Sequence, residues 1–434
     1  MPRIFSSSRM GILALSAAWT FFLACFLAMA TISKAEEPIG SNKTAKSDLR
    51  VETNFEGGNA EVVRFDSAAR TLRIMPEIRD GRGWPCWWYF KLSGLAAGES
   101  VTLEVQAQTK PYSGKRVLGR TWCQPKHAWY SSDGMTWKPS LPGKPAADEG
   151  IAYTIPADAP QIWCAWGPPF VSADAEKLLA DLATQLPESR RFELARTLGD
   201  RPVNGIRIGA EDAPRQVWVN ARQHAWEAGG SWVGRGFVRW FAGEDPAAVE
   251  LRKKTCLHFI PIMDVDNAAL GAGGKDSSPR DHNRDWAATP NYPEIAAAQR
   301  MIREIHAKHG LDVFIDLHNP GHDDPIFFFG PFEYDKMTGI PRRNYQRWID
   351  AAATNIIAPF RVRPTYNFAT YVNTEEERGR MSSGWVRANC GPFTTSITLE
   401  TAWNDARMSQ DGYQLVGAGL GRTLDSYLNE NPRE

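Results

Sequence analysis

Hydrophobic and polar residues alternate in short runs from Leu49 to Phe170, and Gly, Pro, Asn and Asp residues separate these runs. Apolar residues at every second position are typical of strands that bury one face. The clearest runs are Arg50–Phe55, Arg70–Ile74, Trp87–Leu92, Val101–Val105 and Gln161–Trp166. This pattern predicts an antiparallel β-sandwich over residues 49–170.

The pattern changes over residues 171–434, where apolar strands alternate with segments of helical period. The predicted helices are Ala173–Gln185, Ser231–Phe241, Pro293–His309, Arg343–Ala358 and Gly412–Leu428. The predicted strands are Val217–Asn220, Cys256–Ile262, Val313–Leu317 and Thr394–Leu399. Alternating strands and helices predict an α/β domain with a largely buried sheet.

The first 35 residues have the features of an export signal. Arg3 and Arg9 precede the apolar run Gly11–Ala30, and the small residues Ser33 and Ala35 flank a cleavage point. Residues 36–48 are polar and rich in turn formers, which predicts a linker. We therefore expect a periplasmic or secreted protein. Because the apolar run is almost long enough to cross a bilayer, an uncleaved membrane anchor is the alternative.

Charge and cysteine content exclude some functions. The 434 residues include 50 Lys and Arg against 50 Asp and Glu, and no basic run carries interleaved aromatic residues, so nucleic acid is not an expected partner. No cysteine pair has CxxC spacing, which argues against a cysteine metal site, and the sequence leaves disulfide pairing open.

The sequence contains four clusters of polar residues, and three of them lie at or just after apolar segments. The clusters are His224-Ala-Trp-Glu227, Asp281-His-Asn283-Arg284, Asp316-Leu-His318 and Glu400. The first and third can supply two imidazoles and one carboxylate to a metal, which leaves a fourth position open for water, as catalytic zinc requires. Ligands bind at the carboxyl ends of strands in open α/β sheets. The clusters therefore predict one metal site at the sheet edge.

The order of these clusters resembles the M14 zinc carboxypeptidase family over roughly residues 190–430. It looks closest to the cytosolic-carboxypeptidase-like branch, whose members carry a β-sandwich before the catalytic domain, and Trp87–Leu95 looks like part of that sandwich. The resemblance implies a mixed-sheet α/β catalytic domain preceded by an antiparallel β-sandwich.

The resemblance also implies roles for individual residues. His224, Glu227 and His318 would bind one zinc ion per chain, and Glu400 would act as general base and then general acid. The remaining roles concern the substrate and the outer shell of the metal: Asn283 and Arg284 would clamp the terminal carboxylate, and Asp281 would accept the second ring proton of His224.

The sequence departs from the family at several positions. Ala225 and Trp226 replace Pro-Gly in the spacer of the first cluster, and Trp226 is expected to reshape a subsite. The arginine that polarises the scissile carbonyl in the family has no clear counterpart, which leaves Lys275, Arg280 or neither. The phenol over the site is either Tyr371 or Tyr366.

Specificity is expected to depend on the region before Glu400. Arg380 matches best the basic residue that accepts an acidic side chain in the related branch, and the alternative is that it lies on a solvated loop beside Glu375–Glu377.

These observations predict a zinc metallocarboxypeptidase that hydrolyses the C-terminal peptide bond of peptides or proteins, with a preference for an acidic C-terminal residue. One alternative is a zinc amidase or acylase acting on cell-wall peptide or other amides. The other is a catalytically silent protein that binds glycan or peptide. A membrane is an expected partner only if the N-terminal segment stays uncleaved.

Overall fold

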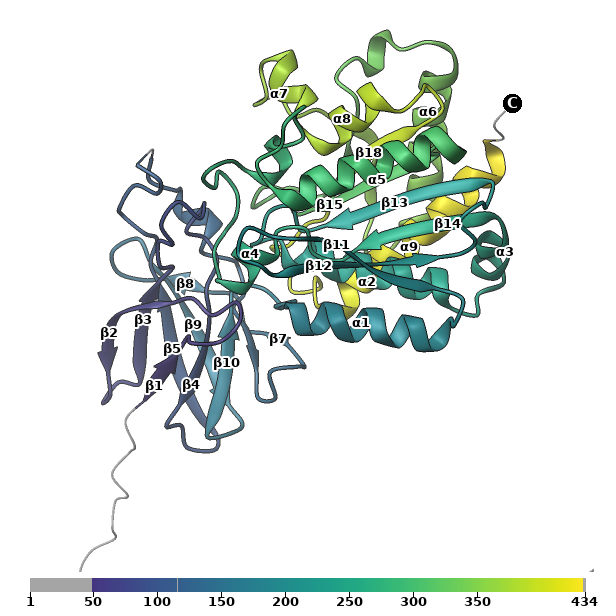
Figure 1. Cartoon of the computed structure of the whole chain (residues 1–434). Helices are drawn as coiled ribbons and strands as arrows, with labels where there is room; N and C mark the ends of the chain where they lie inside the picture. The colour runs from purple at the N-terminus through teal and green to yellow at the C-terminus, as the bar shows by residue number, and fades with distance from the viewer. Residues whose placement is uncertain (1–48, 115, 432–434) are drawn as a thin grey trace, which may run out of the picture. The chain divides into compact units, whose positions relative to one another are not determined.

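The computed structural model describes residues 49–114 and 116–431 (Figure 1). The signal or anchor predicted for residues 1–35 and the linker predicted for residues 36–48 lie outside these residues. Within the described part of the chain, none of the helices combines the length and apolar character needed to cross a bilayer.

Residues before α1 form two five-stranded sheets. The first has the order β1 (Arg50–Glu52), β4 (Tyr89–Ser93), β10 (Gln161–Ala165), β6 (Trp129–Ser131) and β7 (Lys138–Pro139). The second has the order β2 (Glu61–Asp66), β3 (Thr71–Met75), β5 (Glu99–Val105), β9 (Ile151–Ala157) and β8 (Lys144–Pro145). Every pairing is antiparallel except β3 with β5. The antiparallel prediction is confirmed with that one exception.

The remaining strands form one eight-stranded mixed sheet. Its order is β11 (Arg190–Arg196), β12 (Pro202–Ile208), β14 (Thr255–Ile260), β13 (Arg215–Ala221), β15 (Val313–His318), β18 (Thr395–Glu400), β16 (Ile326–Phe329) and β17 (Val362–Asn367). The four central strands β14, β13, β15 and β18 are parallel. Their side chains are buried on both faces of β14, β15 and β18, as expected for parallel strands covered by helices. The predicted fold class is confirmed.

Helices cover both faces of this sheet. The α-helices are α1 (Ser172–Gln185), α2 (Ala228–Ala242), α3 (Pro246–Lys254), α4 (Val265–Ala269), α5 (Pro293–His309), α6 (Gly339–Asn355), α7 (Glu375–Gly379), α8 (Ser382–Asn389) and α9 (Gln410–Glu430). The short 3-10 helices are η1 (Arg120–Trp122), η2 (His282–Arg284) and η3 (Tyr334–Lys336). Figure 1 shows α5 and α8 on one side of the sheet and α2 with α9 on the other. Loops follow the carboxyl ends of the four parallel strands, so the helices that cover the two faces do not cover this edge of the sheet.

One glycine shows how closely the N-terminal sheets meet the loop that precedes the second polar cluster. Gly83 has a φ of +91°, and a Cβ there would lie 2.3 Å from the carbonyl oxygen of Lys275. Backbone hydrogen bonds join the two segments, from Trp84 N to Lys275 O at 3.0 Å and from Gly274 N to Arg82 O at 2.9 Å. Because Gly83 has no side chain, the sandwich can hold the backbone of Lys275 in place.

Candidate active site

Three strand ends bring the first, third and fourth polar clusters together. β13 leads to His224, β15 ends at His318 and β18 ends at Glu400, and all three strands are parallel. His318 and Glu400 are direct register partners. The carboxyl edge of the sheet therefore carries the predicted metal ligands and the predicted base, as expected for an open α/β sheet.

Arg222 fixes the turn between β13 and His224. This buried arginine has a φ of +66°, which a residue with a Cβ rarely adopts. Its guanidinium donates to Ala225 O at 2.7 Å and to Phe170 O at 2.6 Å, so it joins the turn to the end of the sandwich. Burial lowers the pKa of Arg222 to about 10, and nearby carboxylates including Asp264 and Glu227 oppose this shift. The group therefore stays charged at neutral pH.

His224, Glu227 and His318 form a compact buried cluster. One ligand atom from each lies within 4.8 Å of the others. Glu227 lies between the two rings, with Oε1 at 2.8 Å from His224 Nδ1 and Oε2 at 2.6 Å from His318 Nδ1. Burial opposes ionisation of Glu227, but the two imidazoles outweigh it and lower its pKa to about 2. The cluster thus presents two Nδ1 atoms and one carboxylate to a common point.

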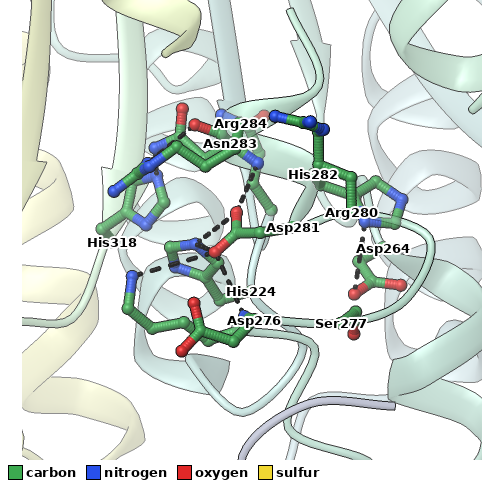
Figure 2. Close-up of polar contacts among 12 residues, drawn as sticks. His224, Asp264, Asp276, Ser277, Arg280, Asp281, His282, Asn283, Arg284 and His318 are labelled. Carbon is green, nitrogen blue, oxygen red and sulfur yellow. Dashed lines mark hydrogen bonds and ion pairs between the residues drawn. The ribbon is translucent and has the colours of Figure 1, made fainter. Parts of the chain in front are cut away.

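A second carboxylate contacts the far nitrogen of each ring. His224 Nε2 lies 3.0 Å from Asp281 Oδ1, and His318 Nε2 lies 2.9 Å from Asp316 Oδ2. Figure 2 shows the Asp281 carboxylate between His224 and the backbone of Asn283, with His318 on the other side of Asn283. A carboxylate that accepts the Nε2 proton leaves Nδ1 free to bind a metal.

Asp316 is a residue whose role the sequence analysis missed. It is fully buried and also accepts hydrogen bonds from Asn220 at 2.8 Å, Ser382 at 2.5 Å and Gln223. Its position two residues before His318 places both side chains on the same face of β15, which is the one signal the sequence carries.

Glu400 is buried and has one carboxylate oxygen without a partner. It is 8% exposed, and its Oε2 forms no hydrogen bond with the described residues. Burial is the largest cause that raises the pKa of Glu400 to about 7, and Glu227 raises it further, whereas His318 and Lys275 lower it. A carboxyl group that titrates near neutrality can both accept and return a proton.

The second polar cluster forms η2, beside the metal ligands. Asp281 caps this turn by accepting from Asn283 N at 2.8 Å. The Asn283 side chain contacts His318 Nε2 at 3.2 Å and accepts from Ser382 N at 2.9 Å. Arg284 NH1 donates to Asn283 O at 2.7 Å, and its guanidinium lies 6.0 Å from the ring of Tyr371. The clamp predicted from Asn283 and Arg284 therefore adjoins the predicted metal ligands.

A cavity of about 320 Å³ opens over these groups. The predicted site residues that line it are His224, Glu227, Asn283, Arg284, His318 and Glu400. Lys275 also lines it, whereas Arg280 does not. Of the two candidate phenols Tyr371 lines the cavity, while the Tyr366 hydroxyl is buried and donates to Tyr345 O at 2.7 Å.

Arg380, the predicted receptor for an acidic side chain, does not line this cavity. It follows the end of α7, and its guanidinium pairs with Glu376 at 2.5 Å, one turn earlier. The alternative placed Arg380 on a solvated loop beside Glu375–Glu377; the structure shows these glutamates as its neighbours but places them in the helix α7.

Comparison with known proteins agrees with this geometry. The family model for zinc carboxypeptidases matches residues 175–405, and the model for the cytosolic carboxypeptidase N-terminal domain matches residues 51–166. The chain belongs to the M14 zinc carboxypeptidase family. The predicted family membership is therefore confirmed.

The related proteins differ in length from this M14 chain. Cytosolic carboxypeptidase 2 of Danio rerio is 22% identical over 317 residues, which cover 67% of this chain and 43% of the relative. Cytosolic carboxypeptidase 6 of Caenorhabditis elegans is 22% identical over 312 residues, which cover 66% of this chain and 65% of the relative. The chain thus spans less than two thirds of these curated relatives.

Solved structures share the fold. A metallo-carboxypeptidase from Burkholderia cenocepacia has a TM-score of 0.73 at 22% identity and covers 88% of this chain and 100% of its own. A metallo-carboxypeptidase from Pseudomonas aeruginosa has a TM-score of 0.72 at 21% identity and covers 88% of this chain and 99% of its own. Both comparisons extend across the N-terminal sheets and the catalytic sheet.

Proposed function

We propose that this M14 chain is a zinc-dependent carboxypeptidase that hydrolyses the C-terminal peptide bond of peptides or proteins. The observation that carries the proposal is the shared cavity: it holds the buried His224, Glu227 and His318 cluster, the Glu400 carboxyl group and the Arg284 guanidinium. A group of metal-ligand side chains, a base and a carboxylate receptor together suit an exopeptidase.

The ligand atoms fit one zinc ion. Two imidazole nitrogens and a carboxylate match the His2Glu set of catalytic zinc sites, and their spacing within 4.8 Å allows a single ion to contact all three. When bound, zinc polarises a substrate carbonyl and lowers the pKa of water. Asp281 and Asp316 hold the two rings in the tautomer that this binding needs.

Glu400 is the proposed proton carrier. Its unpartnered Oε2 is available to take the proton of the attacking water, and its raised pKa allows it to pass the proton to the leaving amine. Because neighbouring strands pair His318 with Glu400, the base is held beside the ligand cluster.

Arg284 and Asn283 are the proposed receptor for the substrate's free carboxylate. A guanidinium presents two parallel N–H donors that match a carboxylate. The preference for a free C-terminus follows, since an amidated end lacks the negative charge.

Lys275 is the proposed cation for the scissile carbonyl. It lines the cavity beside Trp84, at 5.5 Å from the ring, and its Nζ lies 3.9 Å from Asp281 Oδ2. Burial is the largest cause and lowers the pKa of Lys275, but Asp281, Tyr371 and Glu227 together outweigh it and raise the pKa above its ordinary value. It is therefore a fixed positive charge, whereas Arg280 lies outside the cavity.

The position of Arg380 changes the side chain that we expect the enzyme to prefer at the C-terminal residue of its substrate. An acidic C-terminal residue was expected because of this arginine, which instead pairs with Glu376. The cavity lining includes Tyr371, which lies beside Arg284, and the apolar side chains of Phe329 and Met381. We therefore propose that the residue removed has an apolar side chain.

Export is also part of the proposal, and it is supported by the sequence of residues 1–35 alone. The relatives named cytosolic carboxypeptidase point to a different compartment. N-terminal sequencing of the protein recovered from cell fractions separates a cleaved signal from an intact anchor.

The proposed activity is tested by measuring zinc content and turnover on one purified sample. Peptides that differ only in a free or an amidated C-terminus are the substrates. We expect one zinc per chain and release of the last residue from the free acid alone. Zinc without release from any peptide would contradict the carboxypeptidase and favour an amidase acting on other amides. A chain that binds no zinc would favour a binding protein.

A further inference from the structure

Three tryptophan residues form one wall of the active-site cavity. Trp84 and Trp122 belong to the N-terminal part of the chain, and Trp226 lies in the turn between His224 and Glu227. The ring centroids of Trp84 and Trp122 are 4.6 Å apart, and those of Trp122 and Trp226 are 5.8 Å apart. We call these residues the tryptophan wall. The sequence analysis expects Trp226 to reshape a subsite, and the catalytic roles proposed above involve none of the three.

Contacts with neighbouring residues hold the tryptophan wall in place. Trp84 Nε1 donates to Asp276 Oδ2 at 2.9 Å, which fixes a sandwich residue to the catalytic loop. The Trp226 ring packs edge-on against Trp166, with centroids 5.3 Å apart. Rings that are already fixed lose little conformational entropy when a ligand packs against them. The wall is therefore a preformed surface.

The indole N–H of Trp226 has no partner among the described residues. Trp226 is 1% exposed, and its Nε1 is buried. A buried N–H without an acceptor is unfavourable, so such a group in a cavity wall is suited to meet an acceptor on a ligand. A peptide backbone carbonyl is one such acceptor.

The tryptophan wall and the carboxylate clamp have different immediate neighbours in the cavity lining. Arg284 neighbours Tyr371, and Asn283 bonds to Ser382 N next to Met381. Lys275 and Trp84 neighbour each other instead, and Trp226 N donates to Gly273 O in the same loop. Because one cavity contains the clamp, the ligand cluster and the wall, a peptide with its carboxylate at Arg284 and its last amide bond at the ligand cluster can place its preceding residue against the wall.

We propose that the tryptophan wall binds the side chain of the residue just before the cleaved bond and selects an aromatic one there. This inference rests on the proposed carboxypeptidase function. An aromatic ring can pack edge-to-face on Trp84 and Trp122 at the separations of about 4.5–7 Å that such pairs prefer. An alanine at the same substrate position leaves both rings without that contact.

The test uses two peptides that differ only in having Phe or Ala before a common C-terminal residue. For the full-length protein we expect kcat/KM to be about tenfold higher for the Phe peptide. Trp122→Ala should lower kcat/KM for the Phe peptide by about the same factor and leave the Ala peptide within about twofold. Trp163→Ala is the matched control, because Trp163 is a half-buried sandwich tryptophan outside the cavity, with Lys91 over its ring.

A binding measurement separates this inference from the proposed function. Calorimetry on protein treated with a zinc chelator measures peptide affinity without cleavage, and we expect the Phe peptide to bind more tightly to wild type than to Trp122→Ala. If neither peptide is cleaved but the Phe peptide still binds more tightly to wild type than to Trp122→Ala, the proposed carboxypeptidase function is wrong and binding of an aromatic side chain by the tryptophan wall is supported. Equal kcat/KM for both peptides in wild type would contradict the proposed selectivity of the tryptophan wall. An equal loss of kcat/KM for both peptides in Trp122→Ala would contradict it as well.

Discussion

His318 and Glu400 are register partners on the adjacent parallel strands β15 and β18. Their backbones are therefore fixed by the hydrogen bonds of the sheet rather than by a mobile loop. A proposed metal ligand and a proposed base held in this way keep their separation without help from the substrate, which is the preorganisation that catalysis needs.

Replacement of the base tests this arrangement first. Glu400→Gln keeps the size of the side chain but removes its ability to accept a proton, so we expect kcat to fall by about 10²- to 10⁴-fold. Zinc content should not change, because Glu400 is not one of the clustered ligand residues. The measurement is steady-state turnover together with elemental analysis of the same sample. Full activity in Glu400→Gln would contradict its role.

The outer carboxylates should control zinc affinity. In Asp281→Asn or Asp316→Asn an amide replaces the acceptor of the Nε2 proton, so the ring tautomer is no longer fixed. We expect the Kd for zinc to rise by about 10- to 100-fold in either variant. Competition with a chromophoric chelator measures it. Asp323→Asn is the control, since the Asp323 side chain is 90% exposed and its carboxylate pairs with the ring of His322. Unchanged affinity in both buried variants would show that the two carboxylates serve only to fold the edge of the sheet.

The sequence predicted those elements whose ends carry local signals. The predicted helix Pro293–His309 coincides with α5, because Pro293 suits the first turn and Gly310 ends the helix with a φ of +74°. β11 and β12 were not predicted. β11 reads Arg-Arg-Phe-Glu-Leu-Ala-Arg and is mostly solvent-accessible, so it lacks the apolar run of the central strands.

In the candidate site, too, some residues carry a local signal in the sequence and others do not. His224, Glu227, His318 and Glu400 follow or end strands, so their meeting could be predicted from these positions together with the resemblance to the M14 family. The entry of Trp84 and Trp122 into the cavity depends on packing between segments more than a hundred residues apart, such as the Trp84 to Asp276 hydrogen bond, and no local pattern encodes it. Arg380 was predicted to lie at the site because of local sequence similarity, but in the structure its guanidinium pairs with Glu376 of α7.

Arg284 and Arg380 should differ sharply in their effect on substrate recognition. Arg284→Ala removes charged hydrogen bonds to the substrate carboxylate, and we expect kcat/KM for a free-acid peptide to fall by about 10²-fold. The ratio of free-acid to amidated cleavage should fall with it. Arg380→Ala should leave kcat/KM within about twofold, for neutral and acidic C-terminal residues alike. Selective loss of acidic substrates in Arg380→Ala would restore the prediction made from sequence.

Lys275 and Arg280 give a second matched pair. Lys275→Met keeps most of the side-chain volume but removes the charge in the cavity, so we expect kcat to fall by about 10²-fold with a smaller change in KM. Lys275→Arg should recover part of the loss. Arg280→Met should behave as wild type, because Arg280 does not line the cavity. Zinc content is measured in each variant, since Lys275 also neighbours Asp281. Loss of zinc in Lys275→Met would assign this lysine to the metal site instead.

His258 should make the stability of the fold depend on pH. It lies on β14 between the rings of Trp218 and Phe192, and burial is the main cause that lowers its pKa from 6.5 to about 4, with Arg207 adding to the shift and Glu211 opposing it. Above pH 6.5 the ring is neutral in both the folded and the unfolded chain. As the pH falls from 6.5 towards 4, the unfolded chain binds a proton that the folded chain does not.

The free energy of unfolding should therefore fall across this window by up to about 1.4 kcal/mol per pH unit from this residue. Other groups titrate in the same range, so the useful quantity is the difference between wild type and His258→Gln, which has no titrating ring. We expect urea denaturation to show that wild type loses more stability than the variant between pH 6.5 and pH 4. Parallel curves for the two proteins would mean that the buried ring accepts its proton as readily as the unfolded chain does, and that β14 opens to water at this point.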